Sequence, residues 1–540
     1  MQLILDSVWD MADLSSLTTE QVNAEAKGIH NKDATALLDI LMKYQLRSVD
    51  AVASQLAPIS DIARLGADTL KKSQDGRIIV VGAGTSIRLC VQNLIELQTH
   101  GWPASRTDYI VAGGLDALTK SIEAGEDDRA YPVAEVGRLG ITEKDILIGV
   151  SASGRTPVVE EALREARKRG ALTIAIANNK GAPIAELAET HIFLETPPEP
   201  IGGSTRMGAG TSQKICLDLL TNGMLFHHGG FLKKESLEQL DRCAADCQSN
   251  GFASLPDFLQ CLLESERQAV ASVCAARDAL VPAIEKMAEQ LGSRQGRLLT
   301  GGAGTTARAL VQELAELYPT FGFPTSRSHS GILGGHDALL RDYMEVSDQN
   351  EYAWSLFEHF QATENDIAIL GSVSGKTTFT NVLATLFARE DIPTIGFTND
   401  EAGELLSLVD YPVYLKSSKE PGGKLTRLGA GTAHKVVLNV STSAAMTLMG
   451  HVYDGYMVDV KLFCEKLVER AERIVKEITG CSEEVVRKAL AQTKTLYGDA
   501  SVSKAILHLN GVAFEEMDAF LKAHENKSSR AIEASFTLKS

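Results

Sequence analysis

The stretch R-I-I-V-V-G-A-G-T-S-I-R-L, from Arg77 to Leu89, combines an apolar run of strand length, a glycine-rich turn and the beginning of a helical pattern. The same stretch returns 220 residues later as R-L-L-T-G-G-A-G-T-T-A-R-A, beginning at Arg297. Two further motifs recur in the same order, each 221 residues apart: L-I-G-V-S-A-S-G-R-T from Leu147 with A-I-L-G-S-V-S-G-K-T from Ala368, and R-M-G-A-G-T-S-Q-K from Arg206 with R-L-G-A-G-T-A-H-K from Arg427. A fixed order at a nearly fixed spacing indicates a duplicated domain, and we call each copy a lobe.

Within each lobe, an apolar run ends in Gly or Ser and a helical pattern follows it. This alternation predicts an α/β fold with three layers, in which helices cover both faces of a parallel sheet. The predicted strands of the first lobe are 78–81, 109–111, 146–150, 172–177 and 191–194. Those of the second lobe are 297–300, 367–370, 394–397 and 411–415.

The remaining chain reads as helical and gives five expected segments. Helical patterns at 33–72 and 255–291 precede the two lobes, and Ser482 reads as the cap of a helix in the C-terminal part. We therefore expect an N-terminal helical segment, the first lobe, a helical connector, the second lobe and a C-terminal helical bundle, at 1–70, 71–230, 231–290, 291–455 and 456–540.

Composition limits the classes of function. The net charge of -17 over 540 residues argues against a nucleic-acid surface or an anionic membrane, since both require a basic face. The N-terminus lacks a basic segment followed by a longer apolar run, and no stretch has membrane-spanning length, so we expect a cytoplasmic protein. Among the eight cysteines only Cys243 and Cys247 lie near each other, without a His at metal-ligand spacing, so we expect no metal.

Two hydroxyl-rich loops suggest a phosphate site. Each follows a strand and opens a helix, so hydroxyls and backbone N–H groups converge at one edge of the sheet. The first loop fails the dinucleotide fingerprint at Ile87, and no Walker lysine follows it, so we expect neither a nicotinamide cofactor nor any other. The expected binding residues of the two loops are Gly84, Thr85 and Ser86, and Ser151, Ser153 and Thr156.

Three motifs carry a family resemblance: G-A-G-T-S-x-R-L from Gly82, A-S-G-R-T-P from Ala152 and G-S-T-R-M-x-A-G-T-x-Q-K from Gly203. They resemble sugar-isomerase (SIS) domains, specifically the N-acetylmuramic acid 6-phosphate etherases and the related glucokinase regulatory protein. The resemblance runs through 18–214, and an etherase-like C-terminal portion from Gly450 follows the second lobe. Etherases of this family are single-lobe chains that pair as dimers, whereas the regulatory protein carries two lobes, so this chain is expected to form an internal pseudo-dimer.

The resemblance implies two functional glutamates, which it places at Glu96 and Glu126. Cleaving a lactyl ether at carbon 3 of a sugar requires a base for the carbon 2 proton and an acid for the departing oxygen. The mechanism implied by the family assigns Glu126 as the base and Glu96 as the acid, which later activates the added water. Composition alone instead favours a structural interpretation, in which Glu96 is a solvated helix residue and Glu126 is an acid in a loop. Glu316 of the second lobe is the alternative acid, reaching across the pseudo-twofold.

The third motif supplies further expected contacts. Ser204 and Arg206 are expected to contact substrate or to fix their loop, while Lys435 matches the position at which the regulatory protein's second lobe reaches its sugar phosphate. Lys214 and Lys435 alternatively cap helices or pair with acids. The second lobe has Ser347 where Glu126 aligns and Leu425 in place of Ser204, so we expect it to lack the chemistry.

Three functions remain open from the sequence. The first is a lyase that converts N-acetylmuramic acid 6-phosphate to N-acetylglucosamine 6-phosphate and D-lactate in cell-wall amino sugar recycling. The second is a non-catalytic regulator that senses a hexose phosphate and binds a sugar kinase. The third is a phosphosugar aldose–ketose isomerase, which needs one base and the same phosphate loops. The sequence leaves further oligomerisation undetermined.

Overall fold

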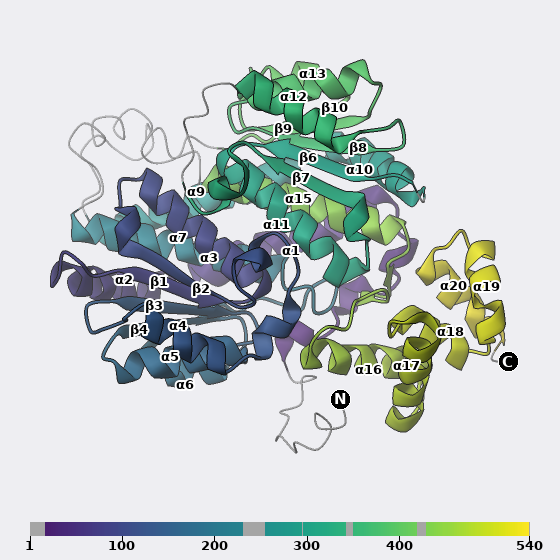
Figure 1. The fold of residues 1–540 in the computed structure, drawn as a ribbon, viewed down its shortest axis with the longest axis horizontal. Coiled ribbons are helices and arrows are strands. Elements are labelled where there is room, and N and C mark those ends of the chain that lie inside the picture. Colours follow the sequence, from purple (N-terminus) through teal and green to yellow (C-terminus); the bar gives the residue numbers. More distant parts are fainter. Residues whose placement is uncertain (1–16, 230–253, 294, 342–348, 418–427, 539–540) are drawn as a thin grey trace.

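The chain folds as two α/β lobes followed by a group of helices (Figure 1). The computed structural model describes residues 17–229, 254–293, 295–341, 349–417 and 428–538. The three-layer α/β architecture with two repeated lobes and a helical C-terminal region is confirmed. Cys243, Cys247, Ser347 and Leu425 lie outside the described residues.

The first lobe contains a five-stranded parallel sheet of order β2-β1-β3-β4-β5. Its central strands are runs of Ile, Val, Leu and Ala that are buried along their whole length, because helices cover both faces of the sheet. Its strands are β1 (Ile78–Gly82), β2 (Thr107–Val111), β3 (Ile146–Ser151), β4 (Leu172–Ala177) and β5 (Thr190–Phe193). Its helices are α3 (Gly84–Thr99), α4 (Ala130–Arg138), α5 (Pro157–Lys168), α6 (Pro183–Leu187) and α7 (Gly208–His228).

The second lobe repeats this sheet with the order β10-β9-β8-β6-β7. Its strands are β6 (Leu298–Gly302), β7 (Ser328–Ile332), β8 (Ile367–Gly371), β9 (Thr394–Thr398) and β10 (Tyr411–Tyr414). Strand β7 was not predicted, because its sequence S-H-S-G-I is too polar to read as a strand. It pairs in parallel with β6 at the sheet edge, where partial exposure makes an apolar run unnecessary.

Helices of the second lobe follow the same order as those of the first. They are α11 (Gly304–Phe321), α12 (Gln349–Phe360), α13 (Thr378–Arg389), α14 (Leu405–Leu408) and α15 (Gly429–Leu448). The lobes meet through α3 against α11 and through α7 against α15. Almost every residue of α7 and α15 is buried, because these helices have a sheet or helices on all sides.

The helices outside the lobes join them and extend beyond them. Helices α1 (Ala34–Ala53) and α2 (Leu56–Lys71) precede the first lobe, and α1 packs on both α7 and α15. Helices α9 (Leu255–Ala275) and α10 (Arg277–Gly292) precede the second lobe. The C-terminal group contains a β-hairpin and five helices: β11 (Val452–Tyr453), β12 (Tyr456–Met457), α16 (Glu465–Thr479), α17 (Glu483–Tyr497), α18 (Val502–Leu509), α19 (Met517–Ala523) and α20 (Ser528–Ser535).

Ser482 stands at the N-cap of α17, as the sequence predicts, although its side chain makes no capping hydrogen bond. Short 3-10 turns at Thr18–Glu20, Ala24–Ala26 and Ile29–Asn31 lead into α1. In the described part of the chain, no helix is both long enough and apolar enough to cross a membrane.

Candidate functional site

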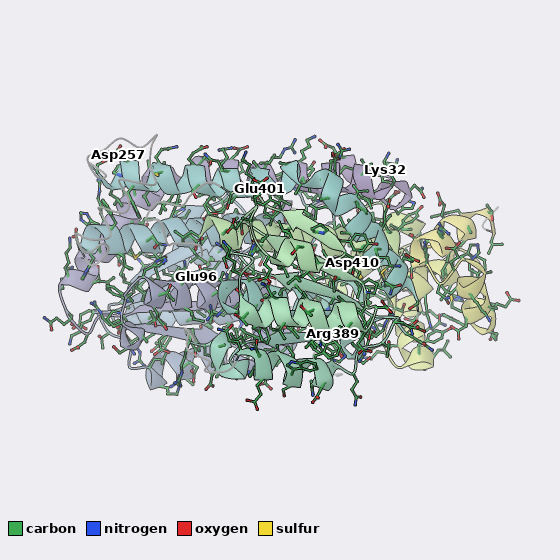
Figure 2. All side chains as sticks on the ribbon, turned by 90° about the horizontal axis from the view of Figure 1, so that it is seen from above. Lys32, Glu96, Asp257, Arg389, Glu401 and Asp410 are labelled. Atoms are coloured by element: carbon green, nitrogen blue, oxygen red, sulfur yellow. The ribbon has the colours of Figure 1, made fainter. Side chains whose placement is uncertain are left out.

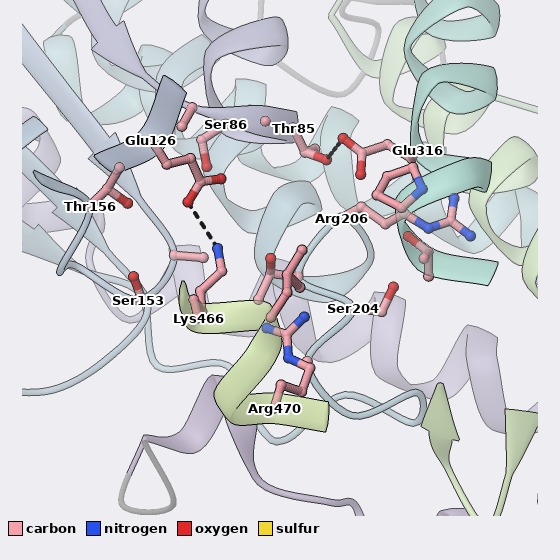
Figure 3. Close-up of a pocket in the computed structure, with 18 of the residues that line it drawn as sticks. Thr85, Ser86, Glu126, Ser153, Thr156, Ser204, Arg206, Glu316, Lys466 and Arg470 are labelled. Carbon is pink, nitrogen blue, oxygen red and sulfur yellow. Dashed lines mark hydrogen bonds and ion pairs between the residues drawn. The ribbon is translucent and has the colours of Figure 1, made fainter. Parts of the chain in front are cut away.

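A solvent-connected cavity lies between the two lobes and the C-terminal helices. The carboxyl ends of β1 and β3 form one side of it, the end of α11 contributes from the second lobe, and α16 forms an outer wall (Figure 3). Ligands of parallel α/β sheets bind at this edge, because strand ends and helix N-termini converge there. The cavity is therefore the candidate active site.

The loop between β1 and α3 lines the cavity with Gly84, Thr85 and Ser86, all three of them expected site residues. Gly84 has a φ of +51°, which glycine adopts without the strain that a side chain would add. The Ser86 hydroxyl donates a 2.8 Å hydrogen bond to Gln213 Oε1, which fixes the loop against α7. The first turn of α3 thus brings its N-terminal dipole and backbone N–H groups to this edge.

The loop between β3 and α5 places three hydroxyls together at the cavity. Ser151, Ser153 and Thr156 all line it. Ser151 Oγ lies 2.8 Å from Thr156 Oγ1 and 3.3 Å from Ser153 Oγ, and the Gly154 N–H donates to Ser151 Oγ at 2.9 Å. Such a cluster at the N-terminus of α5 provides the donors that an anionic phosphate requires.

Glu126 lies beside the first of these loops. A Cβ built on Gly84 would be 3.8 Å from Glu126 Oε1, so the carboxylate approaches the loop backbone closely. Its other oxygen, Oε2, forms a 3.0 Å ion pair with Lys466 Nζ of α16 (Figure 3). As a carboxylate in this position, Glu126 can accept a proton from a ligand in the cavity.

Glu316, near the end of α11 in the second lobe, reaches the same loop. Thr85 Oγ1 donates a 2.6 Å hydrogen bond to Glu316 Oε1, and Arg88 forms a short ion pair with that oxygen. Because Glu126 approaches Gly84 and Glu316 bonds Thr85, the two carboxylates flank adjacent residues of one loop. Figure 3 shows Glu126 and Glu316 on opposite sides of Ser86 and Thr85.

Glu96, the expected acid, does not line this cavity. It lies twelve residues after Gly84, roughly 18 Å along α3 from its own phosphate loop. Its side chain, labelled in Figure 2, is 1% exposed and accepts a 2.9 Å hydrogen bond from Gln92 Nε2. Burial raises the pKa of Glu96 to about 7, with Asp218 reinforcing this effect and Lys214 opposing it.

The pseudo-twofold relation between the lobes explains why Glu316, and not Glu96, reaches the first-lobe cavity. Glu316 is as far along α11 from its own loop as Glu96 is along α3, and the two helices pack against each other. A side chain this far along either helix has passed its own loop and approaches the facing lobe. The carboxylate available to the first-lobe cavity is therefore Glu316.

Lys435 extends from the second lobe to the first, where it contacts the protein backbone. Its Nζ donates a 2.8 Å hydrogen bond to the Arg206 carbonyl and does not line the cavity. In place of the expected contact with a sugar phosphate, it braces the loop before α7. Its counterpart Lys214 donates to the Leu428 carbonyl at 3.1 Å and pairs with Asp218 at 2.6 Å.

The two buried lysines differ in their charge environment. Burial lowers the pKa of Lys435 to about 7, although Glu313 opposes this effect. Burial also acts to lower the pKa of Lys214, but Asp218 and two further carboxylates outweigh it and raise that pKa. Asn439 occupies the position in α15 that Asp218 occupies in α7, so the second-lobe lysine lacks this paired charge.

Ser204 and Arg206 both line the cavity from the loop before α7. The Arg206 guanidinium forms an ion pair with Glu313 and donates a 2.8 Å hydrogen bond to Ser443 Oγ, so it fixes the loop to the second lobe. The Ser204 side chain is buried, and its hydroxyl has no hydrogen-bond partner within the described residues. Of the two expected alternatives, loop fixation suits Arg206, and ligand contact suits Ser204.

Helix α16 adds Lys466 and Arg470, two cavity residues that the sequence analysis did not single out. Their separation of four residues places them on one face of the helix. Arg470 forms two hydrogen bonds, at 2.9 and 2.6 Å, with Glu20, which also lines the cavity. The sequence signal is this i, i+4 pair of cations after the etherase-like segment from Gly450, but it does not reveal that the helix packs onto the first lobe.

The chain is similar to known proteins. Residues 61–167 match the model of the glucokinase regulatory protein N-terminal SIS domain, and residues 136–222 match the SIS domain model. One solved structure, the C-terminal domain of glucosamine-fructose-6-phosphate aminotransferase from Francisella tularensis, covers 75% of this chain and 96% of its own, with 12% identity and a TM-score of 0.48.

Two curated relatives are much more similar in sequence. The N-acetylmuramic acid 6-phosphate etherase of Geobacillus thermodenitrificans is 39% identical over 213 residues, which are 39% of this chain and 72% of the relative. The enzyme of the same name from Deinococcus radiodurans is 40% identical over 215 residues, which are 39% of this chain and 69% of the relative. With this identity over most of each relative, the chain belongs to the N-acetylmuramic acid 6-phosphate etherase family.

Proposed function

We propose that this chain is a carbon–oxygen lyase that cleaves the lactyl ether of N-acetylmuramic acid 6-phosphate, yielding N-acetylglucosamine 6-phosphate and D-lactate. The observation that supports it most strongly is the pair of carboxylates, Glu126 and Glu316, that flanks one phosphate-type loop inside a single cavity. Two such carboxylates match the base and the acid that the elimination requires. The names of the curated relatives agree with this substrate.

In the proposed first half of the reaction, the phosphate lies against the hydroxyls of Ser153 and Thr156. Glu126 removes the carbon 2 proton of the open-chain sugar, which the carbon 1 aldehyde acidifies. The carbon–hydrogen electron pair forms the carbon 2–carbon 3 double bond, and the bond from carbon 3 to the lactyl oxygen breaks. Glu316 gives its proton to that oxygen, so lactate leaves with a hydroxyl group.

The second half adds water to the unsaturated aldehyde. Glu316, now a carboxylate, removes a proton from water as the oxygen attacks carbon 3, and Glu126 returns its proton to carbon 2. Both glutamates end as they began. We assign the acid role to Glu316 in place of Glu96 because Glu316 lines the cavity and Glu96 does not.

Charge in the cavity bears on the acid role. Without substrate, Glu126 pairs with Lys466 and Glu316 pairs with Arg88. A substrate carrying a phosphate and a lactyl carboxylate brings negative charge beside both glutamates, which favours uptake of one proton. We assign Lys466 to the lactyl carboxylate, because its side chain is 32% exposed. The side chains of Arg470, Arg206 and Arg88 are instead buried in ion pairs with Glu20, Glu313 and Glu316.

The direct test is to incubate the full chain with N-acetylmuramic acid 6-phosphate and to measure both products. One lactate should appear for each N-acetylglucosamine 6-phosphate, and in heavy-oxygen water the label should enter the sugar at carbon 3. Absence of lactate from folded protein would overturn the proposal. Label in lactate and none in the sugar would indicate cleavage on the lactyl side of the oxygen.

A second candidate is a sugar-phosphate-responsive regulator, favoured by the match of residues 61–167 to the regulatory protein's domain and by the two lobes in one chain. Pull-down with a sugar kinase, with and without fructose 6-phosphate, tests it. Kinase capture that responds to the sugar phosphate, together with no lactate release, would favour this candidate over the lyase. Interconversion of an aldose and a ketose phosphate without lactate release would favour an isomerase.

A further inference from the structure

The carboxyl ends of β6 and β8 in the second lobe reproduce the hydroxyl arrangement of the first-lobe cavity. Ser372 Oγ lies 2.8 Å from Thr377 Oγ1, the same separation as between Ser151 and Thr156. Gly375, at the centre of this loop, has a φ of +62°, close to the +71° of its first-lobe counterpart. Helix α13 begins directly after Thr377, just as α5 follows Thr156.

The loop before α11 repeats the other half of the arrangement. Gly304 has a φ of +55°, against +51° for Gly84. Thr306 Oγ1 lies 2.9 Å from His434 Nδ1, where Ser86 bonds Gln213 at 2.8 Å. The first turn of α11 is therefore held against α15 as the first turn of α3 is held against α7.

Thr305 is an independent sign of a ligand. Its side chain is 95% buried, and its hydroxyl has no hydrogen-bond partner within the described residues. A Cβ on Gly431 would lie 3.1 Å from the Thr305 methyl, and one on Gly210 would lie 3.3 Å from that of Thr85. The two threonines thus have the same orientation, and the Thr305 hydroxyl points to the binding edge of its lobe as that of Thr85 does.

The difference between the lobes lies in what meets this hydroxyl. Thr85 donates to Glu316. The counterpart of Glu316 is Glu96 of the first lobe, which accepts a hydrogen bond from Gln92 and has Lys214 as a nearby opposite charge. The Thr305 hydroxyl is consequently available to a ligand, and a buried donor without a partner favours an acceptor there.

From this arrangement we propose that the second lobe holds its own phosphomonoester site, formed by Thr305, Ser372 and Thr377 at the N-termini of α11 and α13. Lys376, exposed on the same loop and 3.0 Å from Asp400, lies at its entrance. The site binds a sugar phosphate without cleaving it, since Glu96, the counterpart of Glu316, is buried. The chain then takes two phosphorylated sugars, one to be cleaved and one as an effector.

The test is the binding stoichiometry of N-acetylglucosamine 6-phosphate to the full chain, measured by calorimetry or native mass spectrometry. We expect two molecules per chain for the wild type. The double variant Ser151→Ala, Thr156→Val should keep only the second-lobe site, and Thr305→Val, Thr377→Val only the first. Thr385→Val, a matched change further along α13, should keep both.

Several outcomes decide the matter. Lys376→Ala, on the surface, should weaken the second site about threefold to tenfold without any risk to folding. Inorganic phosphate should compete at the second site, whereas unphosphorylated N-acetylglucosamine should not fill it. One molecule per wild-type chain, or equal filling by the unphosphorylated sugar, would overturn the proposal. Lactate release by Thr305→Val, Thr377→Val is measured in parallel, so a failure of the etherase assignment is seen separately from a failure of the second site.

Discussion

Thr85 of the first lobe donates a 2.6 Å hydrogen bond to Glu316 of the second lobe, which lies 231 residues later in the chain. This bond joins a phosphate-type loop to a carboxylate that comes from a different domain. The candidate site is therefore complete only when the two lobes are packed together.

Glu126→Gln should abolish lactate release and carbon 2 proton exchange together, because both begin with removal of the carbon 2 proton. Loss of a general base typically costs 10²–10⁴-fold in rate. Lactate is measured enzymatically, and exchange is followed by proton resonance in heavy water. Exchange at the wild-type rate in this variant would remove Glu126 from the role of base.

Glu316→Gln should stop lactate release by a similar factor but keep carbon 2 proton exchange, because the base remains and only the acid is lost. Its hydrogen-bonding shape is nearly retained, since the Gln oxygen still accepts from Thr85. Equal loss of exchange and release would point to a collapsed site, and wild-type release would exclude Glu316 as the acid.

Glu96→Gln should leave lactate release within a few-fold of the wild type and should alter the pH dependence of stability. The folded-state pKa of Glu96, about 7, lies above its unfolded value, so its contribution to stability is present below about pH 4.5 and is lost as pH rises through 7. Gln cannot ionise, so the variant should lose less stability than the wild type between pH 5 and 8, by at most on the order of 3 kcal/mol.

Unfolding in denaturant at pH 5 and pH 8 measures this difference. Part of the decline should persist in the variant, because burial also raises the pKa of Glu199 and Glu266 to about 7. If the stability of the variant falls as steeply with pH as that of the wild type, Glu96 is charged in the folded protein. Loss of lactate release in this variant alone, with Glu316→Gln active, would restore Glu96 as the acid.

Lys466→Met should discriminate between substrates with and without a carboxylate on the ether. For N-acetylmuramic acid 6-phosphate, kcat/KM should fall about 10–100-fold, the equivalent of one charged hydrogen bond. For the 3-O-ethyl analogue, which lacks the carboxylate, kcat/KM should fall much less. The readout is the ratio of the two rates, because loss of the Glu126 partner affects both substrates.

Lys476→Met is the matched control for this change, since Lys476 lies on the same helix, pairs with Glu483 and is absent from the cavity lining. It should leave the ratio unchanged. An equal loss on both substrates in Lys466→Met would assign Lys466 to positioning Glu126 and not to the lactyl group.

Ser153→Ala and Thr156→Val should raise KM for the phosphorylated substrate, each removing about 1–3 kcal/mol of hydrogen bonding to a charged group. The turnover number should change less than KM, because the phosphate is remote from the reacting carbons. Ser374→Ala, at the position in the second lobe that corresponds to Ser153, is the control and should leave KM for lactate release unchanged. If KM is unchanged in both first-lobe variants, the phosphate does not bind at the loop between β3 and α5.

The repeat, the α/β lobes and the loops that line the cavity can all be predicted from the sequence. These features depend on neighbours in the chain, because a buried strand, a glycine turn and a helix start are encoded within about a dozen residues. The sequence therefore predicts Gly84, Ser151 and Thr156 as site residues, and all three line the cavity. The edge strand β7 was missed because its polar residues carry little of that local signal.

Which distant side chains reach the cavity depends on how the two lobes and the C-terminal helices pack. Glu96 and Glu316 occupy equivalent positions on α3 and α11, so their local sequences cannot distinguish the one that serves the first lobe. The packing of α3 against α11, the bracing of the loop by Lys435 and the return of α16 with Lys466 all arise from contacts between segments hundreds of residues apart. In that assembly Glu96 is buried and Glu316 lines the cavity beside Thr85, so the packing of the lobes, and not the residue type, selects the glutamate of the site.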